Sequence, residues 1–218
     1  MESPPRRSGH GLPPLVGRTL RVIGDWLLVN LDFYILEWIN GHYADWLDTV
    51  MWTISWPMTW IPLYVVLLGL LAWRYRSIES MALIILGLVL AVGLSDFTCS
   101  GILKPLVCRL RPTHEPAIGP MHLVNGYVGG LYGFCSSHAA NTMAIGLLFS
   151  LLFRNKIATA CMMTWVALNC YSRMYEGVHY PTDIMAGLLI GSLWSVLIWL
   201  ALTRWCHVDA SATPQGGS

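Results

Sequence analysis

The side chains best suited to chemistry are two histidines and a group of basic, hydroxyl and acidic residues in the second half of the chain. Phosphoryl transfer needs cations around the phosphate oxygens, an in-line nucleophile and a proton for the leaving group. All of these side-chain types are present here, so the pattern indicates chemistry on a phosphate. They form three blocks: Lys104 and Arg111; Ser136, Ser137 and His138; and Ser172, Arg173, His179 and Asp183.

The basic residues can bind the oxygens of a phosphate. A short helix beginning just after Lys104 would place Lys104, Cys108 and Arg111 on one face. Arg109 would lie off that face. The Arg111 guanidinium can hold phosphate through two parallel hydrogen bonds, whereas Lys104 acts as a point charge. Arg173 supplies a third cation.

The hydroxyl and histidine residues lie at expected helix starts. Ser136, Ser137 and His138 open an apolar run, and a helix N-terminus favours a bound anion. His179 and Asp183 are four residues apart, so they face alike at another helix start. A carboxylate on one imidazole nitrogen fixes the tautomer and leaves the other nitrogen free to attack. Such a pair could instead bind a metal, but no third ligand with metal spacing is evident.

The elements that must position these residues are apolar. Of 218 residues, 55% are hydrophobic and 11% are charged, the formal net charge is +1, and the mean hydropathy is +0.55. A soluble globular chain carries about 25% charged residues. This composition excludes a soluble enzyme and a disordered protein, and the small net charge excludes a nucleic-acid binder. An integral membrane protein remains.

The fold class predicted is an all-α integral membrane protein with five transmembrane helices. Crossing a bilayer takes about 20 apolar residues. The carboxylates within 14–56 favour an interfacial helix pair over a sixth span, although the basic residues near the N-terminus favour the sixth span. We expect disordered tails at 1–13 and 207–218 around a core at 57–206. The five runs are Met58–Trp73, Met81–Leu103, Ser137–Phe153, Ile157–Tyr171 and Thr182–Thr203.

The distribution of basic residues predicts the orientation in the membrane. Alternating spans place one group on a side that the positive-inside rule makes cytoplasmic. The opposite, outer side receives the long loop 104–136 and residues 172–181, and with them all three blocks. The site is therefore predicted at the outer membrane–water interface. The cytoplasmic group is Arg74, Arg76, Arg154, Lys156 and Arg204.

Several other polar residues have open roles. Cys108 and Cys135 share the long loop and could pair in an oxidising compartment, but free thiols are favoured. Asp96 lies two helical turns before Lys104 and could pair with it or satisfy a neighbouring helix. His122 in the long loop could contact a headgroup, but solvation is favoured.

The three blocks resemble the motifs of the type-2 phosphatidic acid phosphatase (PAP2) superfamily, which read KxxxxxxRP, PSGH and SRxxxxxHxxxD. The first and third blocks match in full, but in the second Cys135 replaces proline and Ser137 replaces glycine. The motifs cover 104–183, and the alternation of spans matches the family's helical core from about residue 57 to 203. The resemblance implies that His179, oriented by Asp183, becomes phosphorylated. It also implies that His138 protonates the leaving oxygen and later activates water.

The resemblance further implies a metal-independent lipid phosphatase without a cofactor, set in the bacterial cytoplasmic (inner) membrane and acting on a lipid phosphate from the periplasmic side. Undecaprenyl pyrophosphate and lipid A are the favoured substrates, and phosphatidylglycerophosphate is an alternative. A lipid phosphotransferase using the same phosphohistidine and a non-catalytic membrane protein are the rival functions. No nucleic-acid partner is expected, and the oligomeric state is open. The expected phosphate-binding set is Lys104, Arg111, Ser136, Ser137, Ser172 and Arg173.

Overall fold

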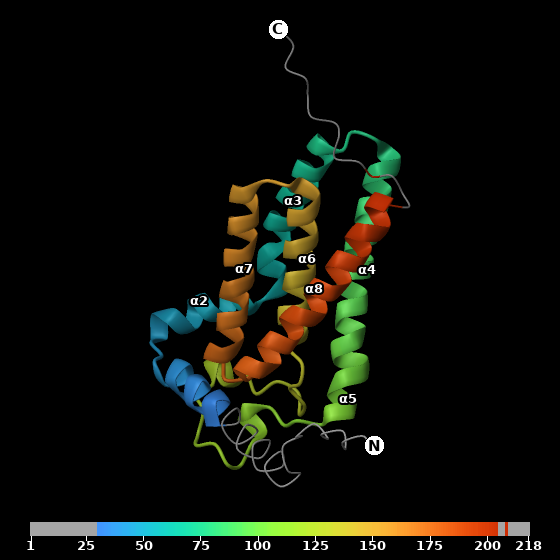
Figure 1. Cartoon of the computed structure of the whole chain (residues 1–218). Coiled ribbons are helices and arrows are strands. Elements are labelled where there is room, and N and C mark those ends of the chain that lie inside the picture. The colour runs from blue at the N-terminus through green and yellow to red at the C-terminus, as the bar shows by residue number, and fades with distance from the viewer. Residues whose placement is uncertain (1–29, 205–207, 209–218) are drawn as a thin grey trace, which may run out of the picture.

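The computed structural model describes residues 30–204 and residue 208. Long helices run side by side, and short helices and loops gather at one end (Figure 1). No strand occurs in this described part, so the prediction of an all-α protein is confirmed there. After helical residues 30–41 the elements are α2 (Asp45–Ser55), η1 (Pro57–Trp60), α3 (Ile61–Arg74), α4 (Ile78–Asp96), η2 (Phe97–Leu103), α5 (Lys104–Val107), η3 (Pro112–His114), η4 (Val124–Gly126), α6 (Ser137–Phe153), α7 (Lys156–Tyr175) and α8 (Pro181–Arg204).

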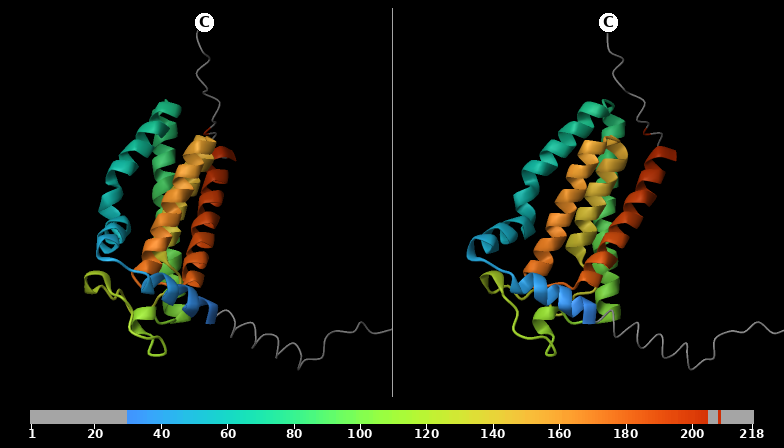
Figure 2. Two further views of the ribbon diagram at one scale, coloured as in Figure 1. Left: turned by 90° about the vertical axis from the view of Figure 1, so that its left-hand side faces the viewer. Right: turned by 60° about the vertical axis from the view of Figure 1, so that its left-hand side comes forward.

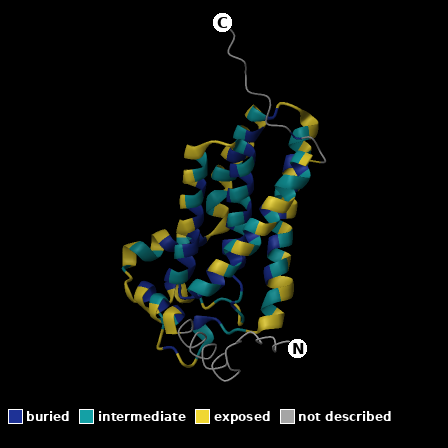
Figure 3. Cartoon of the chain, in the orientation of Figure 1, coloured by how far each residue is buried: buried dark blue, intermediate teal, exposed yellow. Residues whose placement is uncertain are grey.

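Three helical stretches of the described chain are long and apolar enough to cross a membrane. They are Pro57–Arg74, Ile78–Val107 and Pro181–Arg204. The α6 helix is apolar but has 17 residues, and α7 has 20 residues with charged residues near both ends. Many residues on the outer faces of the helices are exposed (Figure 3). Large apolar side chains such as Val65, Val89 and Leu189 are among them. The chain is therefore a helical membrane protein.

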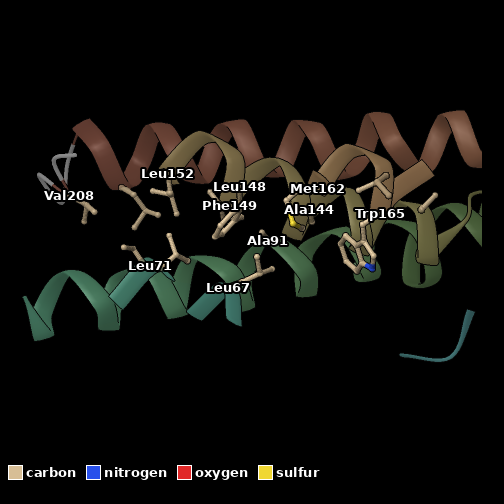
Figure 4. Packing of buried hydrophobic residues seen from close by; sticks show 14 of the residues in the cluster. Leu67, Leu71, Ala91, Ala144, Leu148, Phe149, Leu152, Met162, Trp165 and Val208 are labelled. Atoms are coloured by element: carbon tan, nitrogen blue, oxygen red, sulfur yellow. The ribbon is translucent and has the colours of Figure 1, made fainter. Parts of the chain in front are cut away.

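The α6 helix is the centre of the bundle. It packs against α4, α7 and α8, and it meets α3 on a further side. A helix that is apolar all round is typically buried. Leu148 and Phe149 of α6 lie beside Leu71 of α3 and Met162 of α7 (Figure 4). Val208, which falls in the expected C-terminal tail, is buried in the same core, whereas 1–13 and 209–218 lie outside the described residues.

Two glycines bring α8 into very close contact with α6. A Cβ atom at Gly187 would lie 2.4 Å from the Ser136 carbonyl oxygen, and one at Gly191 would lie 2.3 Å from the Ala140 carbonyl oxygen. Small residues at four-residue spacing allow membrane helices to approach this closely. The sequence thus places glycine where the backbones of the two helices touch.

The face of α8 that carries these two glycines also carries Asp183, one of the expected site residues. Ser195, one turn after the second glycine, donates its hydroxyl to the Ala144 carbonyl at 3.0 Å. Asp183, one turn before the first glycine, accepts on its backbone carbonyl from the Ser136 N–H at 3.0 Å. Helix packing therefore sets Asp183 against the start of α6.

We expect Gly191→Ala to destabilise the protein, because its Cβ has no space against Ala140. Overpacking a tight contact typically costs about 1–3 kcal/mol. Gly69→Ala in α3 is the matched control, because nothing lies within 4 Å of its Cβ position. Thermal unfolding of the purified proteins in detergent measures the difference. Equal melting temperatures for the two variants would contradict the close contact.

The N-terminal helices lie across the end of the bundle rather than along it (Figure 2). Helical residues 30–41 span roughly 18 Å, which is less than the hydrocarbon core of a bilayer. Asn40 fastens this helix by donating to the Tyr175 carbonyl at 2.7 Å and to the His122 carbonyl at 2.9 Å. The described part of the N-terminal segment is thus a pair of short helices, and residues 14–29 lie outside the described chain.

The structure corrects the expectation that His122 is solvated. Its Nε2 atom lies 2.9 Å from the Asp48 carboxylate, and its ring stacks on Tyr43 with centroids 3.7 Å apart. Asp48 also accepts from the Tyr175 hydroxyl at 2.5 Å. The long loop is therefore held against α2 and the end of α7.

Candidate active site

A sharp turn between α7 and α8 brings the third block together. Gly177 has a φ of +69°, a left-handed conformation that glycine adopts without strain. Its N–H donates to the Met174 carbonyl at 2.9 Å, and the Val178 N–H donates to the Arg173 carbonyl at 3.2 Å. The chain thereby folds back so that His179 lies close to Arg173. The turn between α7 and α8 lies at the end of the bundle that the N-terminal helices cover (Figure 1).

His179 and Asp183 face each other in the structure, as their spacing predicts. His179 Nδ1 lies 3.5 Å from Asp183 Oδ2, and both side chains are buried. The same Asp183 oxygen accepts from the Tyr180 N–H at 3.1 Å. Because Nδ1 is turned toward the carboxylate, Nε2 is the ring nitrogen that faces the cations.

Burial keeps His179 in its neutral form. The imidazole is 1% exposed, and this burial lowers its pKa well below the ordinary value. The positive charges of Arg111, Arg173 and Lys104 lower the pKa further. A neutral imidazole has a free lone pair, so His179 is in the state that a nucleophile requires.

Arg111 is the cation nearest to His179. Its Nη1 atom lies 3.4 Å from His179 Nε2 and donates to the Val178 carbonyl at 3.3 Å. Its Nε atom donates to the Tyr132 carbonyl at 3.3 Å. A Cβ at Gly129 would lie 2.9 Å from Arg111 Nη1, so this glycine leaves room for the guanidinium. Burial lowers the pKa of Arg111.

The expected helical face shared by Lys104, Cys108 and Arg111 is wrong. The α5 helix ends at Val107, and Cys108 adopts a left-handed conformation with a φ of 51°. Arg111 instead follows an extended segment, and its N–H donates to the Leu131 carbonyl at 3.0 Å. Arg111 therefore reaches the site through loop pairing, which helical spacing does not describe.

Arg173 is buried among groups that fix its position. It donates to Glu176 Oε2 at 2.7 Å and to the Ser55 hydroxyl, and its guanidinium lies 5.7 Å from the centre of the Tyr127 ring. Burial raises the pKa of Glu176, and the charge of Arg173 opposes that shift. Glu176 thus holds Arg173 in place.

The start of α6 is capped by Ser136. Its hydroxyl accepts from the Ala139 N–H at 3.4 Å, and its own N–H is bound to Asp183. The first-turn amides of Ser137 and His138 have no partner within the helix. The expected anion site at this helix start therefore rests on those amides, because the Ser136 hydroxyl serves as the cap.

Ser137 binds Lys104, and this contact explains one departure from the family motif. Lys104 Nζ donates to the Ser137 hydroxyl at 2.9 Å and to the Ser100 hydroxyl at 3.3 Å. A glycine at this position could not make the bond. Asp96 accepts from the Asn141 amide at 3.4 Å, so it satisfies a neighbouring helix, one of its two expected roles.

His138 borders a cavity of about 300 Å³ at the start of α6. Ser55, Trp60 and Asn169 also line this cavity. His179 and the three cations Lys104, Arg111 and Arg173 all lie within electrostatic range of His138. The second histidine therefore faces an open space beside the cation cluster.

The structure gives Ser172 a local contact. Its buried hydroxyl donates to the Asn169 carbonyl at 2.8 Å, one turn back in α7. Its proton is engaged within its own helix, and this contact provides no support for the expected phosphate bond. The other two blocks and the rest of the third block converge on one end of the bundle.

Sequence reasoning missed several residues that hold the site. Glu176 has a local signal, because it lies three positions after Arg173 in the same helical turn. Ser100 has one too, because it lies four positions before Lys104. Asp32, Ser55 and Arg109 bind partners 74 or more positions away, and no spacing rule points to them. The missed residues are Asp32, Ser55, Ser100, Arg109 and Glu176.

The two loop cysteines do not pair in the structure. Cys108 is exposed and Cys135 is buried, and both are free. Cys135 packs with Cys99 in a small buried cluster, where it occupies the position of the family's proline. Within residues 30–204, no three histidine, cysteine, aspartate or glutamate side chains gather as a possible metal site.

This chain is similar to several known proteins. The sequence model of the PAP2 superfamily matches residues 82–205. A lipid A 4'-phosphatase of Porphyromonas gingivalis is 36% identical over 81% of this chain and 77% of that protein. One of Bacteroides thetaiotaomicron is 30% identical over 87% of this chain and 85% of that protein. The crystal structure of Aquifex aeolicus LpxE is similar in fold, with a TM-score of 0.60, 22% identity, and coverage of 77% of this chain and 94% of that one.

Proposed function

This chain belongs to the PAP2 superfamily, and from that membership we propose that it is a membrane lipid phosphatase acting on a phosphate of a lipid A-type glycolipid. The relatives named lipid A 4'-phosphatases cover most of both chains and support this substrate class. The observation that carries the proposal is the convergence of His179, His138 and three cations at one end of the bundle.

The proposed reaction has two steps. His179 Nε2 attacks the phosphorus, an N–P bond forms, and the bond to the lipid oxygen breaks as His138 gives that oxygen a proton. Water then attacks the phosphorus and loses a proton to His138, the N–P bond breaks, and inorganic phosphate leaves. Lys104, Arg111 and Arg173 stabilise the charge on the equatorial oxygens in both steps.

An apolar path to His138 supports a lipid substrate. An apolar cavity of about 510 Å³ lies between α3, α4 and α6, on the side where α3 leans away from the other long helices (Figure 2). This cavity and the one beside His138 share Tyr64, Val92 and Ile145 in their walls. An acyl chain can therefore lie among the helices while its phosphate reaches the cations.

The membrane arrangement is part of the proposal. We propose that α6 and α7 cross the bilayer together with the three longer stretches, so that five spans alternate. The ends of α3, α6 and α8 that carry Arg74, Arg154 and Arg204 then lie in the cytoplasm. The N-terminal helices lie at the outer interface of the inner membrane, over the site.

Phosphate release from a panel of lipids tests this function. The purified protein should release phosphate from lipid A carrying a 4'-phosphate, and EDTA should leave the rate unchanged because cations of the protein neutralise the phosphate. Undecaprenyl pyrophosphate and phosphatidylglycerophosphate are the other members of the panel. Inhibition by EDTA that one specific metal reverses would contradict metal independence, and release from one of the other lipids alone would overturn the substrate class.

Product analysis separates hydrolysis from phosphotransfer, because the same residues serve both. Incubation with a labelled lipid phosphate and an unlabelled lipid acceptor should yield labelled inorganic phosphate. Labelled acceptor lipid as the main product would show that the phosphohistidine passes its group to a lipid.

Cysteine labelling tests the orientation. In a background with Cys108, Cys161 and Cys206 changed to serine, Ala117→Cys in the long loop should react with an impermeant maleimide in intact spheroplasts. Lys156→Cys, exposed at the opposite end of the bundle, should react only after lysis. The reverse pattern would show that the site faces the cytoplasm.

A further inference from the structure

Arg109 connects the N-terminal helix to the His179–Asp183 pair. Its Nη1 atom donates to Asp183 Oδ1 at 3.0 Å, and its Nη2 atom donates to Asp32 Oδ2 at 2.7 Å. The guanidinium also lies 3.8 Å from the centre of the Tyr180 ring. One cation thus binds two carboxylates from opposite ends of the sequence.

Asp32 is buried and hydrogen-bonded within the network that it forms with Arg109, Thr182 and Asp183. Its carboxyl group is 4% exposed on the helix of residues 30–41 and accepts from the Thr182 N–H at 2.9 Å and from the Thr182 hydroxyl. Thr182 in turn accepts from Arg109 Nη1 at 2.7 Å. A buried carboxylate is costly unless it is paired and hydrogen-bonded, and here both conditions are met.

The geometry of Asp183 shows what the network does. With Oδ1 bound to Arg109, the carboxyl group presents Oδ2 to the Tyr180 N–H and to His179 Nδ1. Oδ2 lies 3.5 Å from Nδ1, and a rotation of this carboxyl group would move that oxygen away from the ring. Arg109 therefore fixes the orientation of the carboxyl group that faces His179 Nδ1.

We propose that Arg109 and Asp32 are positioning residues for the reaction, acting through Asp183 on the tautomer and orientation of His179. The proposal rests on the proposed function, in which His179 Nε2 is the nucleophile. Asp32 lies before residue 82, where the family match begins, so the N-terminal helix contributes to catalysis through a residue outside the matched segment. The sequence analysis placed Arg109 off the helical face expected for Lys104 and Arg111, so the spacing of these residues did not predict a positioning role for Arg109.

A purely structural role is the competing explanation, because the same contacts fasten the N-terminal helix. Asn40 supplies the matched control. It holds the same helix through hydrogen bonds with Tyr175 and His122, and none of its hydrogen bonds in the described part of the chain involves Arg109 or Asp183. Asn40→Ala therefore weakens the attachment of the same helix without removing a side chain that binds Asp183.

The test compares Arg109→Ala, Asp32→Asn, the double variant and Asn40→Ala in the full-length protein. We expect Arg109→Ala and Asp32→Asn to lower kcat by roughly 10–100-fold, a loss of the size seen when the hydrogen-bond partner of a metal-bound histidine is removed. KM and inhibition by inorganic phosphate should stay unchanged, because the three phosphate-binding cations are intact. Asp32→Asn should add no further loss to Arg109→Ala, and Arg109→Lys should restore part of kcat. Asn40→Ala should lower the melting temperature and leave kcat unchanged.

Nitrogen NMR of isotope-labelled histidines provides a readout that does not need phosphatase activity. The chain has seven histidines, and the spectrum of His179→Ala assigns the signal of interest. The unaltered protein and Asn40→Ala should show the Nδ1–H tautomer, whereas Arg109→Ala should show a mixture. An unchanged tautomer in Arg109→Ala, an additive loss in the double variant, or an equal fall of kcat in Asn40→Ala would overturn the proposal. Absence of phosphate release by the unaltered protein would count against the proposed function. The NMR measurement would still test whether Arg109 controls the tautomer of His179, because it does not depend on phosphatase activity.

Discussion

His179→Ala protein is expected to form no phosphoenzyme with any substrate. His179 Nε2 is the ring nitrogen that faces the cation cluster, because Nδ1 is turned to Asp183 at 3.5 Å. Without this imidazole no phosphohistidine can form. Loss of a catalytic nucleophile can lower kcat by about 10⁶-fold. Rapid-quench labelling with a radiolabelled substrate measures the phosphoenzyme directly.

His138→Ala is expected to fail differently, and this contrast tests the division of roles. Without His138 the attack still occurs, but the lipid oxygen leaves without a proton. An activated aryl phosphate needs that proton less, so His138→Ala should keep more relative labelling activity on it than on a lipid monophosphate. His42→Ala, an exposed histidine bonded to the Trp38 carbonyl, is the control and should label normally.

The opposite result would assign the roles in reverse. If His138→Ala abolished labelling while His179→Ala left it intact, His138 would be the nucleophile. The structure favours the first assignment, because His179 faces a carboxylate. The residue one turn after His138 is Thr142, whose hydroxyl donates to the His138 carbonyl at 2.8 Å.

The second large effect is expected at the cations. Arg111→Ala, Lys104→Ala and Arg173→Ala should each lower kcat by about 10²–10³-fold, which corresponds to about 3–4 kcal/mol of transition-state stabilisation. Arg111→Lys should recover little, because an ammonium group cannot donate the two parallel hydrogen bonds of a guanidinium. Steady-state kinetics on one lipid monophosphate measures all four variants.

The cation variants need a charge-matched control and a check on folding. Arg76→Ala removes an exposed cation at the opposite end of the bundle and should leave kcat unchanged. Arg173→Ala also leaves the buried Glu176 without its partner, so its melting temperature should fall more than that of Lys104→Ala. Equal losses of kcat in Arg76→Ala and Arg111→Ala would contradict a local phosphate site.

The amino-acid sequence alone was enough to predict a helical membrane protein and the pairing of His179 with Asp183. The apolar composition requires a membrane, and long apolar runs there form helices because a bilayer core offers no water to backbone groups. The pairing of His179 with Asp183 follows from a spacing of four, since the two share one face near a helix start. Short-range geometry of this kind is fixed by the helix itself and needs no knowledge of the rest of the fold.

Several contacts that support the site come from residues far apart in the sequence. Asp32 and Thr182 are 150 positions apart, Ser55 and Arg173 are 118 apart, and Arg109 and Asp183 are 74 apart. The helical face predicted for Lys104 and Arg111 was wrong because the chain leaves the helix at Cys108 and pairs with another part of the loop. Contacts across such separations depend on how the helices and loops pack against one another. The periodicity of a single segment cannot predict them, because it does not show which other segments it will contact.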